Sequence, residues 1–191
     1  MAPAQLETMI NVKGLTAGYN GNLVFDAISF DVKKGEVFVI LGGSGCGKST
    51  LLKHMIGLYP PISGEILIDE RDMVKAEGNQ RLEILNLIGV MYQSGALFGS
   101  MTLLQNIMLP LEEFTQLPES ARKSIAALKL MLVGLQGFEN HMPSEISGGM
   151  QKRAAIARAM ALDPKILFLD EPSAGLDPIT SAELDQLILK L

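Results

Sequence analysis

The sequence predicts an α/β fold with a mainly parallel central sheet that is covered by helices. Two observations support this prediction. Short apolar runs typical of buried strands alternate along the chain with longer segments that have helical patterns. Glycine is frequent, with 19 residues among 191, and tryptophan is absent. This balance favours sites built from backbone loops, and a chain of this length is expected to form one domain.

Composition and charge exclude several classes of protein. Hydrophobic residues make up 48% of the chain and charged residues 19%, so a folded core is expected rather than disorder. There are 16 Lys and Arg against 21 Asp and Glu, for a net charge of −5. Because no basic run is present, direct binding of nucleic acid is not expected. Cys46 is the single cysteine, which excludes an internal disulfide.

No segment predicts export or a membrane span. Residues 1–12 lack a basic start followed by an apolar run. The stretch from Ile84 to Leu111 has no charge, but polar residues, glycines and a proline interrupt it. We interpret it as buried core followed by an apolar surface patch, because a spanning helix needs about 20 mostly apolar residues. A soluble or peripheral protein in a reducing compartment is expected.

The N-terminal part is expected to be β. Phe25 and Ala27, then Phe30 and Val32 after a slip of one position, alternate with polar residues. The segment Lys33-Lys34-Gly35 predicts the turn that ends this strand. Further along, Val37–Leu41 is a continuous apolar run before glycine. That run predicts a buried parallel strand.

The remaining elements follow from start and stop signals. A helix is expected over 48–58, ended by Pro60-Pro61, and a short strand over 65–69. The region from Pro110 to Val133 lacks strand signals and predicts a helical insertion. The other expected elements are a helix over 119–133 with apolar residues at Ile125, Leu128, Met131 and Leu132, an alanine-rich helix over 150–162, a buried strand over 166–169, and a helix from 181 that is still in progress at 191.

A glycine-rich loop lies between the first predicted parallel strand and helix. Residues 42–49 match the pattern G-x-x-x-x-G-K-[ST]. Glycines let successive N–H groups point at phosphate oxygens, and the following helix adds a positive partial charge. Lys48 would then reach the β- and γ-phosphates, and Ser49 would bind Mg²⁺. A chance match arises about once in a hundred chains of this length, so we expect a nucleotide phosphate site.

Two carboxylates follow the strand expected at 166–169. Asp170 would lie at the edge of the sheet beside the phosphate loop and orient Mg²⁺. Glu171 would face the γ-phosphate and accept a proton from attacking water. An apolar run that ends in acidic residues is common at strand ends. The functional interpretation is therefore favoured only together with the phosphate loop.

Further motifs resemble the nucleotide-binding subunit of ATP-binding-cassette transporters. Residues 146–150, Ile-Ser-Gly-Gly-Met, stand at the place of the family signature L-S-G-G-Q. Gln93 lies where the family has its glutamine loop, and 173–177 resembles the D-loop. Tyr19 lies at the place of the aromatic residue that stacks on adenine. The resemblance covers the chain from about Ile10.

The resemblance implies a P-loop NTPase with an N-terminal antiparallel β portion and an inserted helical subdomain. It implies one domain over 1–191, with a nucleotide-binding core of 1–93 and 163–191 and a helical subdomain of about 94–162. The implied ATP-binding residues are Tyr19, Gly42, Gly43, Ser44, Gly45, Cys46, Gly47, Lys48, Ser49 and Thr50. The implied magnesium ligands are Ser49, Gln93 and Asp170, and the implied catalytic residues are Glu171, Gln93 and Lys48.

The resemblance also implies partners. Ser147, Gly148 and Gly149 would contact the γ-phosphate of ATP held by a second copy, in a head-to-tail dimer, and Asp177 would communicate across it. A membrane permease would be the other partner. The subunit would then be cytoplasmic and peripheral on the cytoplasmic face of the bacterial inner membrane.

Each of these motifs has a simpler interpretation. The Ser147-Gly148-Gly149 segment could be a helix N-cap with flexible glycines, and Asp177 before Pro178 could be another cap. Gln93 could be a turn residue, and Tyr19 could serve in packing. Cys46, in the phosphate loop, is better explained as a tolerated small residue than as a redox switch.

Two departures from the family pattern affect function. Met150 and Ile146 replace the signature Gln and Leu. The segment 147–153, together with 93–98 and 175–180, resembles the Mla/Mce branch, which moves lipids between bacterial membranes. The chain also stops before the strand that ends in the family's switch histidine. His54 and His141 do not match that position, so we expect a C-terminally truncated cassette.

The missing histidine leaves an alternative open. The chain could be a nucleotide-binding fragment or regulatory module without turnover. A soluble cassette of DNA repair or translation is disfavoured, because those proteins carry coiled-coil insertions, tandem cassettes or basic surfaces.

Overall fold

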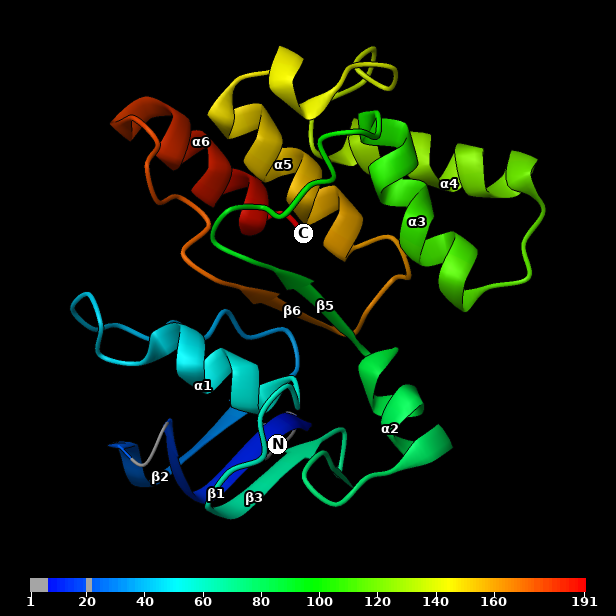
Figure 1. Cartoon of the computed structure of the whole chain (residues 1–191). Coiled ribbons are helices and arrows are strands. Elements are labelled where there is room, and N and C mark those ends of the chain that lie inside the picture. Colours follow the sequence, from blue (N-terminus) through cyan, green and yellow to red (C-terminus); the bar gives the residue numbers. More distant parts are fainter. Residues whose placement is uncertain (1–6, 20–21) are drawn as a thin grey trace, which may run out of the picture. The chain divides into compact units, whose positions relative to one another are not determined.

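The computed structural model (Figure 1) describes residues 7–19 and 22–191. The chain forms two compact units, Met1–Leu87 and Ile88–Leu191. Each unit has its own sheet and its own helices. Among the described residues, no helix combines the length and the apolar character that a membrane crossing requires.

The first unit is built on a four-stranded antiparallel sheet in the order β2-β1-β3-β4. Its strands are β1 (Thr8–Tyr19), β2 (Asn22–Lys33), β3 (Ser63–Ile68) and β4 (Arg71–Asp72). Ile10 pairs with Ile68 and Val12 with Ile66, and all four side chains are buried. The expected N-terminal β portion, its turn at Gly35 and the strand near 65–69 are therefore confirmed.

The expected strand at Val37–Leu41 is wrong. These residues form no strand, and their side chains are exposed, reaching 86% at Leu41. A strand pairs its N–H and C=O groups with those of a neighbour, and residues 37–41 pair with none of the described strands of this unit. The ring of Phe38 instead stacks on that of Phe30, with 5.2 Å between centroids.

Two helices complete the first unit. α1 (Lys48–Met55) begins at the expected lysine but ends three residues before the expected Leu58. The reason is Gly57, whose φ of 71° is the left-handed conformation that ends helices. The other helix, α2 (Gly78–Leu85), has no counterpart among the expected elements, and only Ile84 is buried within it.

The second unit holds a parallel strand pair and a set of helices (Figure 1). β5 (Ile88–Met91) and β6 (Ile166–Leu169) run parallel, with Ile88 opposite Ile166 and Met91 opposite Leu169. The helices are α3 (Leu103–Phe114), α4 (Glu119–Leu132), the short 3₁₀ helix η1 (Pro143–Glu145), α5 (Gly148–Ala159) and α6 (Pro178–Ile188). One buried cluster contains Leu103, Leu130, Ile156 and Leu184, which come from four of these helices.

The helix expected over 119–133 is confirmed as α4, but its buried face differs from the expected one. Leu128, Met131 and Leu132 are each 47% exposed. The buried stripe is Ala126, Leu130 and Val133, which lie four and three residues apart and therefore on one face. The face that contains the small side chain of Ala126 is the one that packs in the buried cluster.

Both remaining helices begin earlier than expected because side chains cap them. α5 begins at Gly148, with Ser147 as its N-cap, and α6 begins at Pro178, with Asp177 as its N-cap. α6 ends at Ile188 rather than continuing to 191.

Candidate functional site

The glycine-rich loop of the first unit folds over its own lysine. The Lys48 ammonium donates hydrogen bonds to the carbonyl oxygens of Gly42 and Gly43, at 2.9 and 3.2 Å. Gly47 occupies the N-cap position of α1 with a φ of 104°, and no side chain caps the helix. No acidic residue lies in the first turn of α1. This helix terminus therefore presents a positive end to an anion.

Two glycines of the loop occupy positions where a Cβ atom has no room. A Cβ on Gly47 would lie 2.5 Å from Val24 Cγ1 and 2.7 Å from Phe25 Cζ. On Gly42 it would lie 2.4 Å from the sulfur of Cys46, whose thiol is free and exposed. Glycine at such positions lets the main chain approach a bound phosphate closely.

The other residues implied to bind ATP lie in the same unit. Gly43, Ser44 and Gly45 are exposed in the loop, while Ser49 and Thr50 are half-buried in the first turn of α1. The backbone of Tyr19 ends β1, opposite Asn22.

Gln93, Asp170 and Glu171 meet at the carboxyl ends of the parallel strands of the second unit. The Asp170 N–H donates to the Met91 carbonyl at 2.9 Å, which extends the ladder by one step. The Gln93 amide nitrogen donates to a Glu171 carboxylate oxygen at 2.7 Å. Parallel pairing thus joins two of the expected catalytic residues that are 78 positions apart. Ligand sites of α/β sheets characteristically lie at such strand ends.

The surroundings of Gln93 and Glu171 are polar but partly buried. Asp170 is only 9% exposed. Burial, and next the charge of Asp170, raise the pKa of the neighbouring Tyr92 hydroxyl. Glu171 has a φ of 46°, which is a strained conformation for a residue with a side chain. Strain of this kind, about 1–3 kcal/mol, collects at functional sites.

Lys152 and Arg158 of α5 bind the main chain that follows β5. The Lys152 ammonium donates to the carbonyl of Gln93, and burial lowers its pKa while Asp170 and Glu171 oppose that shift. Arg158 donates to the carbonyls of Ala96 and Gly95, at 2.7 and 2.9 Å. Neither residue was predicted to belong to the site. The available signal was three basic residues, Lys152, Arg153 and Arg158, in a helix that is otherwise rich in alanine.

The signature residues open α5. The Ser147 hydroxyl oxygen accepts from the Met150 N–H at 3.3 Å, as in a helix cap. A Cβ on Gly149 would lie 2.4 Å from the methyl carbon of Thr180 in α6, whereas Gly148 has space. Gly149 therefore has a packing role, which permits close approach of the two helices.

Asp177 caps α6 through a complete set of hydrogen bonds. One carboxylate oxygen accepts from the N–H groups of Ile179 and Thr180, at 3.1 Å each. The other accepts from the Thr180 hydroxyl at 2.6 Å. The Thr180 hydroxyl, followed by the Thr180 N–H, lowers the pKa of Asp177. The cap interpretation of Asp177 is confirmed at the local level.

The two histidines contact neighbouring residues of their own units. The His54 ring is buried, and its Nδ1 lies 3.0 Å from the Tyr59 carbonyl. His141 is half-buried, with its ring centroid 5.0 Å from that of Phe138.

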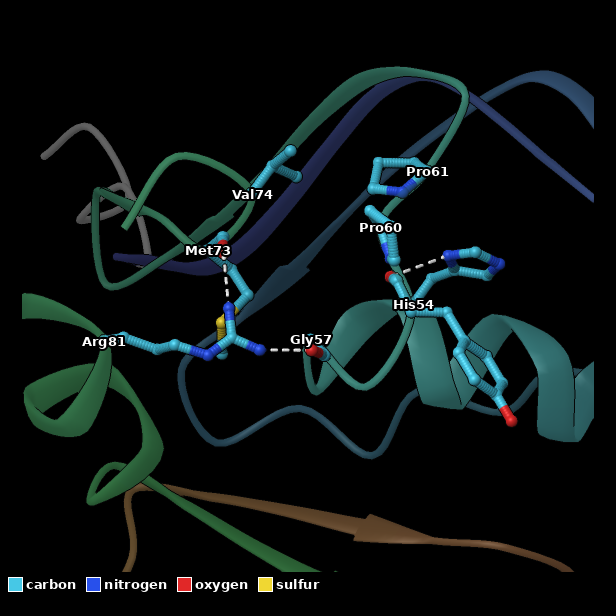
Figure 2. A pocket seen from close by; sticks show the side chains of 8 residues that line it. His54, Gly57, Pro60, Pro61, Met73, Val74 and Arg81 are labelled. Carbon is cyan, nitrogen blue, oxygen red and sulfur yellow. Dashed lines mark hydrogen bonds between the residues drawn. The ribbon is translucent and has the colours of Figure 1, made fainter. Parts of the chain in front are cut away.

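A separate cavity of the first unit contains none of the expected site residues (Figure 2). It has a volume of about 170 Å³ and is lined by His54, Gly57, Tyr59, Pro60, Pro61, Met73, Val74 and Arg81. Arg81 points to the carbonyls of Gly57 and Met73 and donates to both (Figure 2). Its guanidinium therefore binds main-chain carbonyl groups of the same unit.

Each unit offers candidate oxygen ligands for Mg²⁺. Mg²⁺ takes hard oxygen ligands, often one or two from the protein, with the rest from phosphates and water. Ser49 offers a hydroxyl in the first unit, and Asp170 and Gln93 offer oxygens in the second. Among residues 7–19 and 22–191 there is no cluster of three or more His, Cys, Asp or Glu side chains suited to a metal.

Comparison with known sequences gives one family and two kinds of relative. The family model described as ABC transporter matches residues 25–174. The probable ribonucleotide transport ATP-binding protein mkl of Mycobacterium leprae is 49% identical over 182 residues, which are 95% of this chain and 52% of that protein. The intermembrane phospholipid transport system ATP-binding protein MlaF of Haemophilus influenzae is 42% identical over 185 residues, which are 97% of this chain and 70% of that protein. The chain thus spans about half the length of the mkl relative.

Comparison with solved structures gives the same result at the level of the fold. The cbiO1 protein of Clostridium perfringens, part of the ABC transporter complex cbiONQ, aligns with a TM-score of 0.87 and 31% identity over 96% of this chain and 73% of that one. A dimeric ATP-binding cassette in a post-hydrolysis state, bound to ADP and Pi, aligns with a TM-score of 0.84 and 32% identity over 94% and 81%. The expected fold class is confirmed.

Proposed function

The chain belongs to the ABC transporter family, and on this premise we propose that it binds and hydrolyses ATP as the energy-supplying subunit of a transporter. The observation that carries the proposal is the hydrogen bond between Gln93 and Glu171 at the ends of β5 and β6. It places an amide and a carboxylate together in a chain that also has a complete phosphate loop. The proposed organisation is a nucleotide-binding core of 1–93 and 163–191 with a helical subdomain of about 94–162.

The proposed reaction is attack of water on the γ-phosphate of ATP. Glu171 accepts the proton of that water, and Gln93 orients the Glu171 carboxylate. Lys48 and the loop N–H groups neutralise charge on the phosphates, and Ser147 from a second copy adds a donor. Mg²⁺, held by Ser49, Asp170 and Gln93, would supply further charge neutralisation.

The proposed partners are a second copy of the chain and a membrane permease. A head-to-tail dimer places Ser147, Gly148 and Gly149 of one copy on the ATP of the other. Support comes from the dimeric cassette among the similar structures. Because the proposed subunit binds a membrane permease, its proposed location is the cytoplasmic face of the bacterial inner membrane.

For the cargo we propose a phospholipid or related lipid. The support is the identity to MlaF together with the residues around Met150, and around Gln93, that resemble the Mla/Mce branch. The relative mkl, whose name refers to ribonucleotides, makes these molecules the competing cargo. Reconstitution with the permease in vesicles distinguishes the two, since only the true cargo is moved when ATP is added.

Phosphate release tests the proposal against the alternative of a binding module without turnover. Wild-type chain with Mg²⁺ and ATP is expected to release phosphate continuously. The matched variant Lys48→Ala is expected to bind ATP weakly and to release none above the protein-free rate. ATP binding by the wild type with no phosphate release, alone and with its permease, would establish the alternative.

A further inference from the structure

The segment 93–98, which we call the glutamine segment, lies against one face of α5. Lys152 donates to the Gln93 carbonyl, and Arg158 donates to the Gly95 and Ala96 carbonyls. Between these contacts, a Cβ on Gly95 would lie 3.3 Å from the Cβ of Ala155. Lys152, Ala155 and Arg158 follow one another at intervals of three residues, so they share one side of the helix.

Lys152 is the member of this stripe that reaches the site. It is buried, and a buried ammonium must donate to acceptors to offset its lost hydration. Its ammonium donates to the main-chain carbonyl of Gln93. The side-chain amide of the same residue donates to the Glu171 carboxylate. Asp170 and Glu171 also act electrostatically on Lys152. A continuous set of contacts therefore runs from α5 through Lys152 and Gln93 to Glu171.

We propose that Lys152 is a positioning residue for the proposed ATPase reaction: it holds the Gln93 main chain so that the Gln93 amide stays on the Glu171 carboxylate. The inference rests on the proposed function. It also gives α5 a second task, because the helix that begins at Ser147 is tied to the residue assigned as the base. Lys152 touches neither phosphate nor water in this role, since its ammonium is directed to the Gln93 carbonyl.

Lys152 and Arg158 have separable contributions. Arg158 binds the carbonyls of residues 95 and 96, and its guanidinium carbon lies 6.0 Å from the centroid of the Phe98 ring. These contacts fix the later part of the glutamine segment. Lys152 binds residue 93 itself, so loss of Lys152 changes the orientation of Gln93 first. Misplacement of a catalytic group by about 1 Å can cost about a hundredfold in rate.

Steady-state kinetics of the full chain tests the proposal. Lys152→Met is expected to lower kcat at least about tenfold while the KM for ATP changes less than about twofold. Lys152→Arg, which keeps a cationic donor, is expected to recover most of the loss. Lys123→Met is the matched control, because Lys123 is an exposed lysine of the same unit that pairs with Glu119. Wild-type kcat in Lys152→Met, or an equal loss in Lys152→Arg, would overturn the proposal.

A double variant tests whether Lys152 acts through Gln93. Removal of the Gln93 side chain in Gln93→Ala leaves Lys152 nothing to orient, so Lys152→Met with Gln93→Ala is expected to be no slower than Gln93→Ala alone. Losses that multiply would show a direct role for Lys152 and contradict the proposal. Thermal unfolding checks that each variant is folded, and Lys152→Gln replaces Lys152→Met if the latter is not.

A readout without turnover separates this inference from the proposed function. The side-chain amide signal of Gln93, assigned by its loss in Gln93→Ala, is measured by nuclear magnetic resonance in nucleotide-free protein. Lys152→Met is expected to shift this signal, and Lys123→Met is not. An unchanged signal overturns the positioning role, whereas absence of phosphate release from the wild type overturns the proposed function.

Discussion

Gly47 is the residue at which the phosphate loop turns into α1, and its hydrogen atom is the largest substituent the site accepts. Its φ is 104°, and a Cβ would overlap Val24 and Phe25 of β2. The same conformation leaves the first N–H groups of α1 without a side-chain cap. The steric requirement and the anion-binding property therefore come from one backbone geometry.

Substitution of Gly47 tests this link at the residue scale. Gly47→Ala is expected to destabilise the loop by about 1–2 kcal/mol from the left-handed conformation alone, with the overlap in addition. ATP affinity, measured by calorimetry, is expected to fall at least about tenfold. Gly99→Ala is the matched control, because a Cβ there meets nothing within 4 Å. Unchanged affinity in Gly47→Ala would mean that the loop adopts another geometry with nucleotide.

At the same scale, sequence patterns located the loop and the acidic pair because both are local. Lys48, Ser49 and Asp170 could be named as candidates from their spacing within short motifs beside expected strands and helices. The contact of Lys152 with Gln93 joins residues 59 positions apart. It depends on how α5 packs beside β5, and no local pattern contains that information.

At the scale of elements, Asn106 of α3 holds the chain between Phe98 and Thr102. It is 0% exposed. Its amide nitrogen donates to the carbonyls of Phe98, Met101 and Thr102, at 3.1, 3.1 and 3.0 Å. Its oxygen accepts from the Phe98 N–H at 2.8 Å. One buried side chain thus satisfies the main chain that links the glutamine segment to α3.

Replacement of Asn106 by leucine removes the side-chain partner of the Phe98 N–H and of these three carbonyls. The Phe98 and Thr102 carbonyls keep a main-chain N–H donor. Asn106→Leu is expected to lower the free energy of unfolding by about 3 kcal/mol, measured by urea denaturation. Asn140→Leu, at an exposed asparagine of the same unit, is expected to change it by less than about 0.5 kcal/mol. Equal effects of the two substitutions would contradict the structural role of Asn106.

Other elements show where sequence patterns were insufficient. The apolar run 37–41 predicts a strand, but in the structure these residues pair with none of the described strands. α2 and β5 were not predicted, because α2 is mostly polar and β5 is four residues within a long uncharged stretch. For α4 the apolar residues offered two possible faces, and packing selected the stripe that contains Ala126 and Leu130.

The uncharged residues 96–98 are our candidate for the surface that contacts the proposed permease. Leu97 is half-buried and packs against the core of the second unit, so a charge there would also disturb folding. Phe98 is 49% exposed and is the better probe. Phe98→Ser is expected to reduce copurification with the permease at least about fivefold, since buried aromatic side chains dominate interface energies.

Phe114 supplies the control for this prediction. It is an exposed phenylalanine of the same unit, at the end of α3. Phe114→Ser is expected to leave copurification unchanged, and both variants are expected to bind ATP as the wild type does. A loss shared by both variants would place the contact elsewhere.

The proposed hydrolysis depends on Glu171 as the general base. A general base contributes about 10²–10⁴-fold to the rate, so the rate of phosphate release by Glu171→Gln is measured alongside its ATP affinity. We expect wild-type affinity with at least about a hundredfold slower release, while Glu113→Gln, at an exposed glutamate of α3, matches the wild type. Phosphate release by Glu171→Gln at the wild-type rate would show that Glu171 is not the base.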